Sequence, residues 1–201
     1  YVVGSVAVSD GLNDVALTGE LVVAVNRSGL FVFDVSTPQQ PQQIAFLPLP
    51  DGYRVRLDGD VAYVSGDAAG LQVVDLSDPH APALIGSYDT AGSTAGVMIS
   101  GDHAFLGQST DGLVITNIAD SNSVEVVGRS DGGAAGETLL IGNHLYVADW
   151  TTPALRVLDV SDLSNPVDVG SIDNFTAGDL ATDGIHLYAT RFSVETQLYY
   201  L

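Results

Sequence analysis

The feature that most constrains the fold of this chain is an internal repeat. Glycines that precede a short apolar segment are separated by 40, 42, 41 and 42 residues, and they are Gly19, Gly59, Gly101, Gly142 and Gly184. Two further markers share this spacing: glycine followed by leucine at Gly29, Gly70 and Gly112, with Ala154 in the fourth place, and a polar residue at Asp34, Asp75, Asn117 and Asp159. Three markers with one period indicate a chain built from similar structural units.

Each repeat unit shows the pattern of four short strands. Between residues 53 and 89 the apolar segments are YRVRL, VAYVS, LQVVDL and ALIGSY, and Gly, Asp, Ser and Pro separate them. Valine, isoleucine and tyrosine favour strands, and glycine and proline favour turns. At the end of the third strand, Asp75 is expected to accept hydrogen bonds from the amides of its own turn. A unit of about 40–45 residues with four strands has the size of a propeller blade, so we predict an all-β propeller with antiparallel blades.

The third strand and the turn after it carry a family resemblance. The segments GLQVVDLSDPHAPALIGSY and ALRVLDVSDLSNPVDVGSI resemble the LVIVD repeat, a β-propeller repeat of secreted and cell-surface proteins of bacteria and archaea. The third unit departs from the pattern, because LVITNIADSNSVEVVG has Asn117 in place of aspartate and no proline in its turn. The resemblance implies a propeller in an extracellular or cell-surface setting. It implies no common catalytic residues.

We expect residues 1–201 to form a single β-propeller domain. The predicted repeats are 14–52, 53–94, 95–136 and 137–178, and a fifth combines 179–201 with 1–13. The N-terminal segment YVVGSVAV aligns with fourth strands such as ALIGSY, whereas the C-terminal segment supplies three strands. Pairing residues 1–8 with residues 197–201 would complete the fifth blade and leave no strand edge exposed. The prediction is therefore a closed five-bladed ring, and the alternative is a fragment of a six- or seven-bladed ring.

Charge excludes several classes of partner. The chain has 25 acidic residues and 6 basic ones, all arginine, and its formal net charge is −19. Such a charge repels nucleic acids and anionic membrane surfaces. No apolar run approaches the roughly 20 residues that a membrane span needs, so we expect no membrane insertion. The chain has no cysteine, so neither disulfides nor thiolate metal sites are available.

The loops on one face of the predicted propeller differ most between blades, and we expect a binding site there. This face holds the single tryptophan, Trp150, which suits stacking on a sugar or anchoring a protein partner. The simpler interpretation is that Trp150 packs on a neighbouring blade and that the arginines pair with nearby carboxylates. The predicted ligand-binding residues are Trp150, Asp149, Arg27, Arg191, Tyr53, Arg54, Asp67 and Phe192.

Three carboxylates open the inner strands of different blades. Asp14, Glu137 and Asp179 are expected near the mouth of the central channel, where converging carboxylates could bind a cation such as Ca²⁺. The same three residues could serve as the acid, base and helper of a glycosidase, a hypothesis that rests on analogy between folds. His103, His144 and His186 share one repeat position, and we expect that position to keep them apart around the ring.

The sequence thus favours a non-catalytic binding, display or structural interaction module at the cell surface. Its expected partner is a protein or a carbohydrate, and the domain is expected to belong to a larger multidomain chain or assembly. The alternative is a glycoside hydrolase-like propeller that uses the carboxylates at the channel mouth. Two segments, 26–28 and 174–176, also match the acceptor pattern for N-glycosylation.

Overall fold

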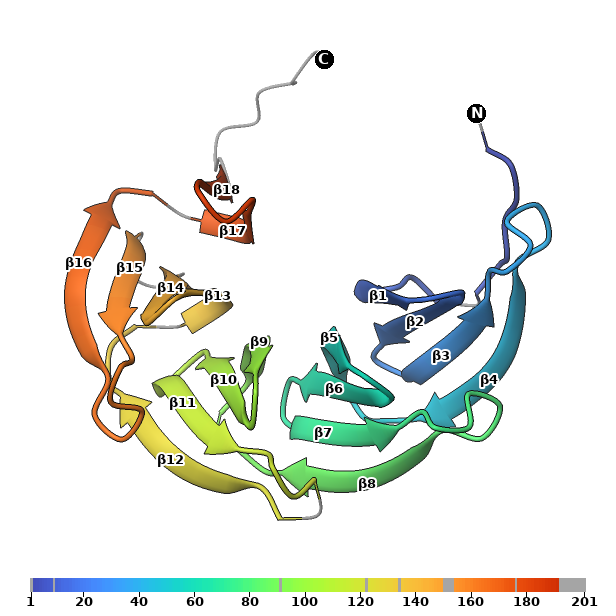
Figure 1. Cartoon of the computed structure of the whole chain (residues 1–201), viewed down its shortest axis with the longest axis horizontal. Coiled ribbons are helices and arrows are strands. Elements are labelled where there is room, and N and C mark those ends of the chain that lie inside the picture. Colours follow the sequence, from blue (N-terminus) through green and yellow to red (C-terminus); the bar gives the residue numbers. More distant parts are fainter. Residues whose placement is uncertain are drawn as a thin grey trace.

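The computed structural model describes residues 2–8, 10–90, 92–121, 123–133, 135–149, 154–175 and 177–191. Its strands form sheets that stand side by side in an open arc (Figure 1). Within the described residues, four sheets have four antiparallel strands each and a fifth has two. Each four-stranded sheet follows the chain from the inside of the arc outwards, as in a propeller blade. The predicted all-β blade architecture is confirmed, whereas the closed ring is not.

The strands belong to the blades in chain order. Blade 1 comprises β1 (Asp14–Thr18), β2 (Leu21–Asn26), β3 (Gly29–Asp34) and β4 (Gln42–Pro48). Blade 2 comprises β5 (Gly52–Asp58), β6 (Val61–Gly66), β7 (Gly70–Asp75) and β8 (Ala83–Tyr88). Blade 3 comprises β9 (Thr94–Ser100), β10 (His103–Gln108), β11 (Gly112–Asn117) and β12 (Glu125–Ser130). Blade 4 comprises β13 (Ala135–Ile141), β14 (His144–Asp149), β15 (Ala154–Asp159) and β16 (Val167–Asp173), and a hairpin of β17 (Ala177–Thr182) and β18 (Leu187–Arg191) follows.

The hydrophobic core lies between blades. Side chains of β2 and β3 pack against those of β5 and β6, with Val23, Val32 and Val64 fully buried in this interface. Similar clusters join blade 2 to blade 3, blade 3 to blade 4, and blade 4 to the hairpin of β17 and β18. Alternate residues of a strand point to opposite faces of its sheet, so a blade with a neighbour on each side contributes to two of these interfaces. Among the described residues, no helix is long and apolar enough to cross a membrane.

The polar residue at the end of each third strand shapes the turn that follows it. The carboxylate of Asp75 accepts a hydrogen bond of 2.8 Å from the amide of Ser77, and Asp34 and Asp159 make the same bond in their blades. In blade 3 the side-chain oxygen of Asn117 accepts an equivalent bond of 2.9 Å from Ala119. The expected turn role of Asp75 is therefore confirmed, and asparagine provides the same acceptor.

Residues 2–8 form no strand but occupy the place of one. A Cβ added to Gly4 would overlap the carbonyl oxygen of Pro38, four residues after Asp34. A Cβ added to Gly128 on β12 would likewise overlap the carbonyl oxygen of Leu163, four residues after Asp159. The N-terminal segment therefore contacts the β3–β4 turn of blade 1 in the same way as β12 contacts the β15–β16 turn of blade 4. The predicted partner segment, 197–201, lies outside the described residues.

The last outer strand, β16, lacks this cover in the described part of the chain. All seven of its residues are exposed, including Val167, Val169 and Ile172. A Cβ added to Gly170 would meet no atom within 4 Å. Gly128 and Gly170 occupy the same position of the repeat. They differ in their surroundings, because a turn of the following blade covers Gly128 and no described atom covers Gly170.

Alanine substitutions at these three glycines have different expected effects. Gly4→Ala and Gly128→Ala place a methyl group against a backbone carbonyl, and we expect each to lower the free energy of unfolding by about 1–3 kcal/mol. Gly170→Ala adds a methyl group in open space and reduces backbone freedom, so it is expected to be neutral or stabilising by up to about 1 kcal/mol. Urea denaturation monitored by circular dichroism measures all three. Equal effects at the three positions would contradict the packing described here.

Substitutions of Asp75 test the turn. The amide and hydroxyl of Ser77 hold the pKa of the Asp75 carboxyl below its ordinary value. At neutral pH we expect a lower melting temperature for Asp75→Ala than for Asp75→Asn, because Asn117 shows that an amide oxygen accepts the bond. A carboxyl with a lowered pKa stabilises the fold above its unfolded pKa and loses this contribution as the pH falls through the folded pKa. The advantage of the wild type over Asp75→Asn should therefore disappear in acid, and thermal melts over a pH series measure it.

Candidate functional site

A polar pocket lies among the loops that join strands at one face of the propeller. Its volume is about 200 Å³. Its lining comes from the β2–β3 loop, the β4–β5 connection with the start of β5, the β6–β7 loop, and the end of the β8–β9 connection with the start of β9. The lining residues are Arg27, Asp51, Tyr53, Asp67, Ser93 and Ala95. We call it the loop-face pocket. Three of the predicted ligand-binding residues, Arg27, Tyr53 and Asp67, line it together.

Backbone hydrogen bonds between consecutive loops position the pocket walls. The amide of Asp51 donates to the carbonyl of Arg27 at 3.1 Å, and the amide of Asp67 donates to the carbonyl of Asp51 at 3.2 Å. The amide of Thr94 continues the series, donating to the carbonyl of Asp67 at 3.1 Å. Asp51 has a φ of 54°, a left-handed conformation that is uncommon outside glycine. Hydrogen bonds on both sides thus hold Asp51 in this conformation.

The charged side chains of the loop-face pocket have no ion pair within the described residues. Arg27 and Asp67 are exposed and Asp51 is partly buried, and the salt bridges of the described chain involve none of them. Tyr53 is held differently, because the guanidinium carbon of Arg54 lies 5.4 Å from the centre of its ring. This distance is typical of a cation–π contact. The pocket therefore presents one cation, two carboxylates and an aromatic ring.

Two other predicted ligand-binding residues, Asp149 and Arg54, are not among the described residues that line this pocket. Asp149 is fully buried and its carboxylate lies against Gly133, so it is not available at the surface as predicted. Arg54 extends toward the inside of the arc, as described below. Trp150 and Phe192, and the side chain of Arg191, lie outside the described residues.

The three carboxylates predicted at the channel mouth do converge, but two arginines lie between them. Arg56 on β5 donates to Asp14 on β1 at 3.0 Å and to Glu137 on β13. Arg54, also on β5, has its Nε 3.3 Å from Glu137 and its Nη2 3.0 Å from Asp179 on β17. We call these five residues the inner-strand ion cluster. It connects blades 1, 2 and 4 with the C-terminal hairpin.

Burial affects the cluster most at Glu137. Its side chain is 5% exposed, whereas that of Asp179 is 69% exposed. Burial raises the pKa of the Glu137 carboxyl, and the charges of Arg56 and Arg54 oppose this shift. The described residues contain no group of three or more His, Cys, Asp or Glu side chains placed to hold a metal ion. The three carboxylates predicted to bind Ca²⁺ instead form ion pairs with the guanidinium groups of Arg54 and Arg56.

The repeat pattern indicated the carboxylates of the cluster but not Arg56. A signal was present, because Arg54 and Arg56 are two residues apart on an inner strand. Residues with this spacing point to the same face of a strand. The two arginines therefore reach the same set of carboxylates.

Residues that end the second strands are polar and buried in several blades. Asn26 is 2% exposed, and its side-chain oxygen accepts bonds from the amides of Ser28 at 2.8 Å and Gly29 at 3.2 Å. This burial makes Asn26 inaccessible to glycosylation in the folded chain. Gln108 is 1% exposed, and neither polar atom of its carboxamide has a partner in the described structure. The blades therefore differ from one another at the loop face in buried residues as well as in exposed ones.

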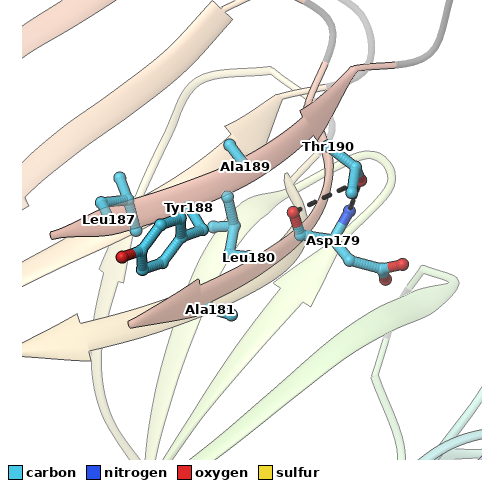
Figure 2. A pocket seen from close by; sticks show the side chains of 7 residues that line it. All are labelled: Asp179, Leu180, Ala181, Leu187, Tyr188, Ala189 and Thr190. Atoms are coloured by element: carbon cyan, nitrogen blue, oxygen red, sulfur yellow. Dashed lines mark hydrogen bonds between the residues drawn. The ribbon is translucent and has the colours of Figure 1, made fainter. Parts of the chain in front are cut away.

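A second depression lies on the C-terminal hairpin. Its volume is about 360 Å³ and both of its strands, β17 and β18, contribute to its lining (Figure 2). Leu180, Leu187 and Ala189 supply its apolar part, and the amide of Asp179 donates to the hydroxyl of Thr190 at 2.8 Å. The surface lies at the open side of the arc, where β18 is the last described strand (Figure 1).

The LVIVD repeat profile matches residues 12–44, 51–90, 91–131 and 132–174. The chain therefore belongs to the LVIVD repeat family, as the third strands and their turns indicated. A search of curated proteins gave no match.

Solved structures show the same fold at low sequence identity. A protein from Lactobacillus plantarum aligns with a TM-score of 0.79 and 12% identity over 93% of this chain and 66% of its own. The Cps50 (Swd1) β-propeller domain of Myceliophthora thermophila aligns with a TM-score of 0.73 and 12% identity over 92% of this chain and 68% of its own. The computationally designed protein Ika4 aligns with a TM-score of 0.62 and 10% identity over 82% of this chain and 94% of its own. These similarities identify a β-propeller fold, and the chain spans about two thirds of the first two structures.

The inner-strand ion cluster is expected to stabilise the fold through Arg56. Arg56→Met leaves Glu137 buried with one fewer cation, and we expect a loss of about 1–3 kcal/mol in the free energy of unfolding, less than for a fully buried pair because Arg56 is partly exposed. Adding Glu137→Leu should restore part of this loss, because it removes the buried charge. Arg129→Met is the control, since Arg129 is exposed and donates only to the hydroxyl of Tyr88 among the described residues. Equal losses for the single variants Arg56→Met and Arg129→Met, or no coupling in the double-mutant cycle of Arg56→Met and Glu137→Leu, would show that the cluster is not stabilising.

Proposed function

We propose that this chain is a non-catalytic binding module of the cell surface that recognises a protein or a carbohydrate through its loop face. The observation that carries the proposal is the loop-face pocket. Arg27, Asp51 and Asp67 line it without ion-pair partners in the described part of the chain. Unpaired charged groups that converge on a concave surface are characteristic of ligand-binding sites. The acidic composition and the family membership support the surface setting.

The inner-strand ion cluster disfavours the alternative, a glycoside hydrolase. Such enzymes need one carboxylic acid that donates a proton and a second carboxylate that is free to act as a base or nucleophile. Here Arg56 bridges Asp14 and Glu137, and Arg54 contacts both Glu137 and Asp179. The carboxylates serve as partners of arginine, so the proposal includes neither catalysis nor a bound cation at this position.

We also propose that the five-bladed ring closes through the N-terminal segment, which would be the fourth strand of the blade that β17 and β18 begin. The packing of Gly4 on the turn of blade 1 supports this assignment, because Gly128 packs in the same way on blade 4. The depression on the hairpin of β17 and β18 also fits a blade of which the described residues supply two strands.

Binding to bacterial and archaeal cell-envelope preparations tests the proposed function. The labelled domain is incubated with sedimented envelopes, and the bound fraction is measured for the wild type and for substitutions on the two faces. We expect Arg27→Ala and Trp150→Ala to reduce binding, the latter by about 2 kcal/mol if Trp150 is an anchor. Asp78→Ala and His80→Ala alter the opposite face, where both residues are exposed, and should bind as the wild type does.

Two results would contradict the proposal. One is an equal loss of binding for substitutions on both faces, which would indicate a nonspecific charge effect. The other is release of nitrophenol from aryl glycosides by the wild type but not by Glu137→Gln. Thermal melts of each variant separate a loss of binding from a loss of folding.

A further inference from the structure

We propose that the loop-face pocket binds a single neutral sugar unit, such as the terminal residue of a glycan. This inference rests on the proposed function and names the ligand class of the same site. The pocket is small, with a volume of about 200 Å³, whereas sites for drug-sized ligands occupy roughly 300–1,000 Å³. A pyranose ring suits this smaller scale.

The charges of the pocket favour a ligand that both donates and accepts hydrogen bonds. Asp51 and Asp67 can only accept when ionised, and Arg27 can only donate. A simple cation would meet repulsion from Arg27, and a simple anion would meet repulsion from the two aspartates. Each hydroxyl of a sugar donates and accepts, so neighbouring hydroxyls can satisfy groups of both signs. Hydrogen bonds to ionised side chains are also stronger than those between neutral groups.

Tyr53 supplies the apolar contact that a sugar ring requires. It lies at the start of β5, directly after Gly52, and a Cβ at Gly52 would meet the carbonyl oxygen of Asn26 at 2.8 Å. Glycine therefore allows the start of β5 to approach the β2–β3 loop that carries Arg27. The contact with Arg54 orients the ring of Tyr53. An aromatic ring beside polar groups presents one surface to the C–H groups of a sugar while its hydroxyl remains free to hydrogen bond.

The pocket is organised before any ligand binds. The hydrogen bonds from Asp51 to Arg27 and from Asp67 to Asp51 fix three consecutive loops relative to one another. Asp51 keeps its left-handed conformation within this arrangement, and such uncommon conformations are concentrated at functional sites. A preorganised site spends less of its binding energy on ordering its own loops.

Nuclear magnetic resonance of the ¹⁵N-labelled domain tests the ligand class. The probes are the methyl glycosides of glucose, galactose, mannose and N-acetylglucosamine, with arginine and glycine as cationic and zwitterionic comparisons. We expect at least one glycoside to shift the amide signals of Tyr53, Asp67 and Ser93. The affinity should fall at least about tenfold in Tyr53→Ala and in the more conservative Asp67→Asn. Asp111→Asn removes the same charge from the corresponding loop of blade 3, outside the pocket, and should leave the affinity unchanged.

The outcomes separate this inference from the proposed function. If no glycoside shifts these signals, or if Asp111→Asn weakens binding as much as Asp67→Asn, the sugar assignment is overturned. Shifts caused only by arginine or only by glycine overturn it in favour of a cationic or a zwitterionic ligand. Envelope binding that still depends on the loop face would leave the proposed function intact in each of these cases. Unchanged thermal melts of Asp67→Asn exclude unfolding as the cause of lost binding.

Discussion

The packing of each blade against its neighbours is the constraint on which the rest of this structure depends. A four-stranded blade has two apolar faces, and it can bury both only between two other blades. The clusters around Val64, Leu106 and Leu145 meet this requirement within the arc. Blade 1 has a partner blade on one side, and on the other it receives cover from the N-terminal segment, where Val8 packs against Phe31 and Phe33. The same requirement explains why β16, whose residues are all exposed, marks the open side of the arc.

The repeat allowed most of the fold to be predicted, because the same local rule acts in every unit. The polar residue at the end of each third strand accepts an amide hydrogen bond in all four blades, including Asn117. Closure of the ring does not follow from such local rules. It depends on the angle between blades and on contacts between chain segments far apart in sequence, which a repeat pattern does not contain. The position of Gly4 on the turn of blade 1 is the part of that prediction that the packing supports.

The candidate sites were predicted in part, for a related physical reason. Positional equivalence correctly brought Asp14, Glu137 and Asp179 to one region, and it brought Arg27, Tyr53 and Asp67 to one pocket. It did not indicate which charges would pair. Long side chains such as those of Arg54 and Arg56 reach across several strands, so their partners depend on three-dimensional distances. Asp149 shows a different limit. Its position in the repeat predicted a place at the surface of the loop face, but its carboxylate is buried beside Gly133.

The first residues of β5 connect the two charged regions of the molecule. Gly52 permits close approach to blade 1, Tyr53 lines the loop-face pocket, and Arg54 joins the inner-strand ion cluster. Because the guanidinium of Arg54 lies over the ring of Tyr53 while it contacts Glu137, one side chain links both regions. The buried carboxylate of Glu137 therefore does more than stabilise the inner strands. It also pairs with Arg54, whose guanidinium lies over the ring of Tyr53, so that a structural ion pair and a wall of the pocket share one residue.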